Sequence, residues 1–101
     1  MPQITKQYKF CAAHRYWNDD WDEAKNIEVF HDDVRLHGHN YDLYITIKGP
    51  IDNASGFVVN LKDLNEVVNK KVINVLDHNL IQDVEWFKDK QPSTENLVVF
   101  I

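Results

Sequence analysis

The sequence predicts an α+β fold, in which a pair of antiparallel strands is accompanied by two helices. Residues 4–14 and 37–48 alternate apolar and polar side chains at period two, as strands do when one face of a sheet is buried. Two later segments begin at residues that often cap helices, Asn60 and Ser93. The length of 101 residues fits one domain, so we expect a single domain over residues 1–101.

The first predicted strand covers residues 4–14. One of its faces carries Tyr8, Phe10, Ala12 and His14. Cys11 falls on the opposite face, and because a lone cysteine among apolar neighbours usually packs in the core, we expect a structural role for it rather than a nucleophilic one. Residues 15–36 contain many charges and are expected to form an elaborated loop with a short helix around Glu23–Phe30.

The second predicted strand covers residues 37–48 and ends at Gly49-Pro50. One of its faces carries His37, His39, Tyr41, Leu43, Ile45 and Ile47. If the two strands pair as a simple antiparallel hairpin, His14 lies near the His37 end of the second strand.

The first long helix is predicted to begin after Asn60 and to run from Leu61 to about Val75. Residues 76–90 are expected to be loop with extended pieces, and a second helix starts at Thr94. No capping residue follows the apolar run at its end, so we expect the chain to be a fragment whose natural end lies further on. The alternative is a natural end that is buried in an oligomer.

Charge and composition exclude several classes of function. The formal net charge is −5, which disfavours nucleic-acid binding because phosphate groups require a basic surface. The apolar runs are only a few residues long, so no membrane segment is expected. A single cysteine excludes an intramolecular disulfide, and no secretory signal precedes the first strand, so we expect a cytoplasmic protein.

Three histidines form the strongest chemical signal. His37 and His39 lie two residues apart on one strand, so their imidazoles point the same way, and His14 is expected to converge on them. Three neutral imidazoles with a fourth position left open are typical of a catalytic Zn²⁺ site. The alternative is that the histidines merely line a cleft.

Two weaker signals lie later in the chain. Asp77 and His78 are adjacent and could act as a general acid/base pair, although most such dipeptides lie in solvated loops. Glu95 falls in the first turn of the second helix, where a carboxylate complements the helix dipole without any further function.

Four motifs in order resemble the 6-pyruvoyltetrahydropterin synthase family, which includes the bacterial 6-carboxytetrahydropterin synthases of queuosine biosynthesis. They are Phe10-Cys-Ala-Ala-His14, His37-Gly-His-Asn-Tyr41, Leu76-Asp-His78 and Pro92-Ser-Thr-Glu-Asn96. The resemblance covers nearly the whole chain.

The resemblance implies the tunnelling fold, with two long antiparallel strands, two helices packed on one face and two further strands. Subunits of this family join edge to edge into barrels, commonly a homohexamer made of two trimers. The resemblance also implies a lyase that acts on 7,8-dihydroneopterin triphosphate, a pterin, to give a 6-pyruvoyl or 6-carboxy product.

The same resemblance assigns roles to residues of this chain. Zn²⁺ is held by His14, His37 and His39. Asp77 and His78 belong to the proton-transfer machinery. The pterin pocket, which forms between subunits, is expected to include Ser93, Thr94 and Glu95.

The chain departs from the family pattern in two places. Relatives of the pyruvoyl and carboxy types carry a cysteine base shortly before His37, where this chain has Asp33, with His31 and Asp32 as weaker substitutes. An acid at this place suggests either a variant that gives 6-hydroxymethyl-dihydropterin for folate or a non-catalytic homologue that binds metal or pterin. The final strand pair, which supplies a pterin-anchoring glutamate in the family, is expected to be missing from residues 1–101.

Overall fold

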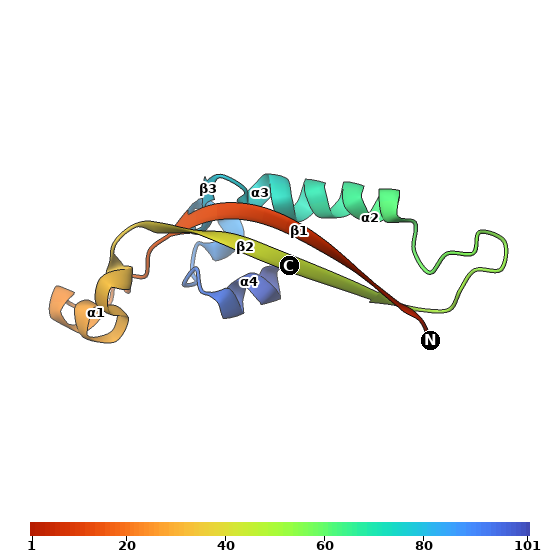
Figure 1. Cartoon of the computed structure of the whole chain (residues 1–101). Helices are drawn as coiled ribbons and strands as arrows, with labels where there is room; N and C mark the ends of the chain where they lie inside the picture. Colours follow the sequence, from red (N-terminus) through yellow and green to blue (C-terminus); the bar gives the residue numbers. More distant parts are fainter.

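The computed structural model describes residues 1–101 and is dominated by a long two-stranded ribbon (Figure 1). The ribbon consists of β1 (Gln3–His14) and β2 (His37–Lys48). The helix α1 (Glu23–Phe30) lies beyond one end of the ribbon, and the loop between β2 and α2 lies beyond the other. The α+β class is confirmed.

The strands pair antiparallel along their full length, from Gln3 opposite Lys48 to His14 opposite His37. The simple hairpin register expected from the sequence is therefore correct. A third short strand, β3 (Asn79–Leu80), adds in parallel to the other edge of β1, opposite Ala12 and Ala13. The sheet order is β2-β1-β3, so β2 is an edge strand along its whole length.

One face of β1 supplies the floor of the hydrophobic core. Its buried members are Tyr8, Phe10 and Ala12, as the alternation predicts. Residues from the helices and from the segment between them cover this face, and they are Val68, Val72, Leu76, Ile81, Phe87 and Leu97. The Tyr8 hydroxyl donates a hydrogen bond of 2.6 Å to Asn65 Oδ1, which joins the strand to the first long helix. Cys11 is not part of this core, contrary to expectation.

The first long helix begins as predicted and runs one residue beyond its predicted end. It comprises α2 (Leu61–Val68), a π-helical turn (Asn69–Ile73) and α3 (Asn74–Leu76). Asn60 caps it, because its side chain accepts a hydrogen bond of 3.0 Å from Lys62 N. The π-turn has no signal in the local sequence, and its residue Val72 is buried in the core.

The last helix, α4 (Thr94–Phe100), is capped by Ser93, whose hydroxyl accepts a hydrogen bond of 3.1 Å from Asn96 N. The segment before it, which was expected to be loop with extended pieces, contains β3 and two short 3-10 turns (Ile81–Asp83 and Glu85–Phe87).

The connection between β1 and β2 is organised by a fully buried polar side chain, Asn26 of α1. Its amide oxygen accepts from Asn18 N at 2.7 Å, and its amide nitrogen donates to the carbonyls of Asn18, Trp21 and Asp22. Asp22 caps α1 through Lys25 N at 2.8 Å. The short helix predicted here is confirmed at Glu23–Phe30.

The molecule is elongated, with principal extents of 61 × 24 × 21 Å. Only 12 of its 101 residues are buried. No helix has both the length and the apolar character needed to cross a membrane.

Candidate metal centre and active site

Three histidines converge at the end of the ribbon where β1 leaves the sheet and β2 enters it. The ring centroid of His14 lies 4.5 Å from that of His37 and 5.0 Å from that of His39, and the last two are 4.9 Å apart. One ring nitrogen from each lies within 4.8 Å of the others. The register brings them together, because His14 pairs with His37 and the side chain of His39 points to the same face.

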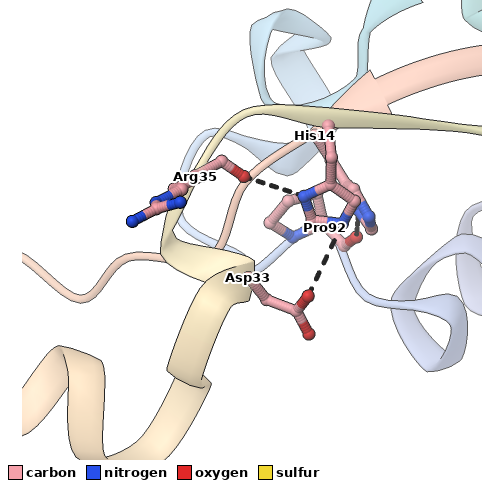
Figure 2. A network of polar contacts seen from close by, with 5 residues as sticks. His14, Asp33, Arg35 and Pro92 are labelled. Carbon is pink, nitrogen blue, oxygen red and sulfur yellow. Dashed lines mark hydrogen bonds and ion pairs between the residues drawn. The ribbon is translucent and has the colours of Figure 1, made fainter.

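Backbone carbonyls orient two of the three rings (Figure 2). His14 Nδ1 lies 2.6 Å from Pro92 O, and His37 Nδ1 lies 2.8 Å from Arg35 O. A carbonyl oxygen can only accept, so Nδ1 carries the proton in both rings and Nε2 keeps its lone pair.

The Nε2 atom of His14 is buried and has no hydrogen-bond partner. A buried polar atom without a partner is costly and requires an explanation. The donor set fits a divalent metal, because the rings offer lone pairs while backbone carbonyls fix the orientation of two of them, as is common around zinc-binding histidines.

The electrostatic environment keeps His14 neutral. Burial lowers the pKa of His14, and the neighbouring rings of His37 and His39 lower it further, against the opposing effects of the Pro92 carbonyl and the Asp33 carboxylate. The neutral form is the one that ligates metals. The shift therefore favours metal binding over protonation.

Asp33 lies beside the cluster, on a 3-10 turn (His31–Val34) that precedes β2. Its Oδ1 is 3.8 Å from His37 Nε2, and its carbonyl accepts a hydrogen bond of 2.9 Å from Tyr16 N, which ties the turn to the end of β1. Asp32 and His31, the weaker substitutes for the missing cysteine, are exposed, and neither contacts the three rings through a hydrogen bond or ion pair.

Two tyrosines that the sequence reasoning did not select flank the histidines. Tyr16 packs 5.0 Å from His14, and Tyr41 packs 5.9 Å from His39, measured between ring centroids. Burial raises the pKa of both hydroxyls, and for Tyr16 the charges of Asp33 and Glu95 raise it further. Tyr41 lies two residues beyond His39 on the same strand face, so the alternation of β2 could have identified it.

The segment Pro92–Glu95, at the start of α4, contacts the histidine cluster through Pro92. Ser93 uses its hydroxyl to cap the helix, and Thr94 and Glu95 are exposed. Pro92, which precedes them, is buried and holds His14. Neither of the two main surface pockets is lined by Ser93, Thr94 or Glu95, so their pterin-binding role stays a prediction.

Asp77 and His78 do not join the three histidines. They form a second group with Cys11, which projects from the face of β1 opposite to His14. Asp77 Oδ2 contacts His78 Nδ1 at 3.0 Å, and Asp77 Oδ1 accepts from Cys11 N at 2.9 Å. The backbone hydrogen bond from Cys11 is the main cause that lowers the pKa of Asp77, so this carboxyl stays ionised at neutral pH.

Comparison with known proteins identifies the family. The family model of 6-pyruvoyl tetrahydropterin synthase matches residues 3–101. The chain belongs to the 6-pyruvoyl tetrahydropterin synthase family. The structure of Caenorhabditis elegans 6-pyruvoyl tetrahydropterin synthase is 32% identical and superposes with a TM-score of 0.87 over 99% of this chain and 74% of that one. The predicted tunnelling fold is consistent with this match.

Two relatives in the family illustrate the similarity in sequence. The 6-pyruvoyl tetrahydrobiopterin synthase of Drosophila melanogaster is 41% identical over 97% of this chain, and the human protein of the same name is 36% identical over 98% of it. The chain spans 60% of the length of the Drosophila protein and 70% of the human one.

Proposed function

We propose that the chain is a zinc-dependent lyase that acts on 7,8-dihydroneopterin triphosphate and gives the 6-pyruvoyl product. The observation that carries the proposal is the cluster of His14, His37 and His39, with its buried and unpartnered Nε2 atom. The relatives described above bear the name of the pyruvoyl enzyme, which favours this product over the 6-carboxy product.

The three histidines would hold Zn²⁺ through ring nitrogens that the backbone leaves free. Bound zinc would act as a Lewis acid on the substrate's side-chain hydroxyls. The carbonyls of Pro92 and Arg35 keep two of the rings in the orientation for ligation. Tyr16 and Tyr41 pack beside the cluster, and their raised pKa values mean that both keep their phenolic protons at neutral pH.

Proton transfer requires a base close to the substrate. Asp33 is the carboxylate next to the histidines, at 3.8 Å from His37, and it would accept a proton on the same face of the sheet. Asp77 and His78 lie behind the sheet and would serve a site formed with another copy of the chain. This separation supports the predicted homo-oligomer, with a pterin pocket between subunits and a hexamer of two trimers as the expected assembly.

Turnover of 7,8-dihydroneopterin triphosphate by the zinc-loaded protein tests the proposal, with the product identified by mass. We expect release of triphosphate and a 6-pyruvoyl product that both depend on His14. Binding of zinc and pterin without any product would instead identify a non-catalytic homologue.

A second candidate product is 6-hydroxymethyl-dihydropterin, favoured by the presence of Asp33 where relatives carry a cysteine. The carboxylate beside the metal ligands is a weaker base than a thiolate, so it favours a different cleavage of the side chain. The test compares Asp33→Asn with Asp33→Cys. We expect Asp33→Asn to abolish turnover and Asp33→Cys to change the product or accelerate the reaction, whereas full activity of Asp33→Asn would remove Asp33 from the mechanism.

A further inference from the structure

The side chain of Gln91 joins the segment before α4 to the chain that leaves β1. Gln91 Oε1 accepts a hydrogen bond of 3.3 Å from Trp17 N, and Gln91 Nε2 donates one of 2.6 Å to Trp17 O. These partners fix which end of the amide faces which group, because a backbone N–H can only donate and a carbonyl can only accept. The side chain therefore exchanges two hydrogen bonds with Trp17, as a residue paired across an antiparallel ladder does.

The backbone of Gln91 is held from the helix side. Its carbonyl accepts a hydrogen bond of 2.8 Å from Ser93 N and another of 2.8 Å from Asn96 Nδ2. Ser93 is also the residue that caps α4, so the position of Gln91 is coupled to the first turn of this helix. Gln91 is half-buried, so water has limited access to these hydrogen bonds. The residue thus links α4 to the end of β1 through both its backbone and its side chain.

Gln91 stands one residue before Pro92, whose carbonyl holds the ring of His14. His14 Nδ1 lies 2.6 Å from Pro92 O, and both residues are buried (Figure 2). Pro92 has no N–H with which to add a backbone hydrogen bond of its own. Three hydrogen bonds join residues 91–92 to residues 14–17, and two of them come from the Gln91 side chain. The position of Pro92 O against the imidazole therefore depends on Gln91.

We propose that Gln91 is a positioning residue for His14, because it holds the Pro92 carbonyl where that carbonyl fixes the imidazole for metal ligation. The proposal rests on the zinc site of the proposed function. The Nδ1 proton of His14 points to Pro92 O, so the lone pair stays on Nε2, the buried atom without a hydrogen-bond partner. Groups that orient a ligating histidine commonly contribute about tenfold to a hundredfold to metal affinity.

The position of the proton on the His14 ring tests the proposal in the metal-free protein. Nitrogen NMR of protein with labelled histidines distinguishes a protonated Nδ1 from a protonated Nε2. We expect the parent to carry the proton on Nδ1, and Gln91→Ala to show a mixture of the two forms, because the acceptor that selects one of them is no longer held in place. Gln7→Ala is the matched control and should keep the parent pattern, since Gln7 is exposed and lies on the face of β1 opposite to His14.

Zinc affinity, measured by competition with a chelator, gives the second readout. We expect Gln91→Ala to bind Zn²⁺ about tenfold more weakly than the parent, and Gln7→Ala to bind it equally well. Gln91→Glu separates hydrogen bonding from packing, because it keeps the shape of the side chain while its carboxylate cannot donate to Trp17 O. We expect Gln91→Glu to bind zinc as weakly as Gln91→Ala does.

An unchanged proton position on His14 in Gln91→Ala, or a Gln91→Glu variant that binds zinc as tightly as the parent, would overturn the proposal. Failure of both variants to fold would also overturn it, because Gln91 would then support the fold rather than the ring of His14. If the parent protein binds no zinc, the proposed function fails, and the position of the His14 proton alone decides whether Gln91 orients the ring.

Discussion

At the scale of residues, the candidate metal centre depends on which ring nitrogen carries the proton. Pro92 O and Arg35 O can only accept, so they place the proton of His14 and of His37 on Nδ1. Burial lowers the pKa of His14 and maintains the neutral form. The Nε2 atoms of both rings therefore keep their lone pairs and have no proton that a metal would need to displace.

We expect one zinc ion per chain, and its loss in His14→Ala. Removing one of three protein ligands weakens zinc binding by orders of magnitude, because the remaining two imidazoles cannot fill the site. His31→Gly is a suitable control, since His31 lies outside the cluster and its φ of 54° suits glycine. Elemental analysis of protein purified without chelator measures the zinc content. Equal zinc in both variants would show that the three histidines are not the ligands.

Asp77→Asn is expected to retain zinc while turnover falls by about a hundredfold, within the range of general acid–base catalysis. The amide oxygen can still accept the hydrogen bond from Cys11 N, so the local backbone is preserved. It cannot stabilise a charged His78, which is the function that the carboxylate would serve. Zinc content and kcat measured on the same preparation check this, and a variant that lost its metal would refute the assignment to proton transfer.

At the scale of elements, a buried polar side chain organises the connection between β1 and β2 from within. Asn26 makes four hydrogen bonds to backbone groups while fully buried. Around it, Trp21 and Tyr16 stack on Phe30. This arrangement fixes the turn that carries Asp33 next to the histidines.

Asn26→Ala is expected to lower the free energy of unfolding by about 2 kcal/mol or more, because it leaves buried backbone groups without partners. Asn74→Ala is the control, since Asn74 is exposed, so its effect should stay within about 0.5 kcal/mol. Urea unfolding measures both. Equal stability of the two variants would mean that the connection is not needed for the fold.

At the scale of the whole molecule, the chain is too extended to be self-sufficient. Its radius of gyration is 17.5 Å, whereas a compact domain of this length has about 13 Å. β2 leaves one edge without a partner, and large apolar side chains are exposed, among them Val98 and Val99 of α4. Exposed strand edges and apolar faces of this kind favour association between copies.

We therefore expect a ring-forming oligomer in solution. Light scattering at micromolar concentration measures the mass directly. A stable monomer under these conditions would contradict the prediction.

Mixing two inactive variants tests whether the site is shared between copies. His14→Ala removes a metal ligand, and Asp77→Asn impairs the group on the opposite face of the sheet. If the two groups act together across an interface, co-refolded mixtures should regain part of the turnover, because some sites combine an intact half from each variant. Mixtures as inactive as their components would indicate that each site uses residues of one chain only.

The sequence by itself determined the ribbon, its register and the meeting of three histidines. Period-two alternation identified the faces of both strands, and antiparallel pairing placed His14 next to His37. Helix starts at Asn60 and Ser93 followed from capping chemistry, which is local. The ordered motifs indicated the family, and the roles assigned to Ser93, Thr94 and Glu95 stay predictions.

Only the tertiary structure decided what surrounds Cys11. Local pattern suggested a core cysteine, yet the segment before β3 runs along the edge of β1 and brings Asp77 into contact with Cys11 across 66 positions of sequence. His78 stays exposed, as expected for a solvated loop. The π-turn after α2 and the burial of Asn26 likewise could not be predicted from the local sequence. The physical reason is the same in each case: these features are set by how distant segments pack, and neither propensity nor periodicity encodes that packing.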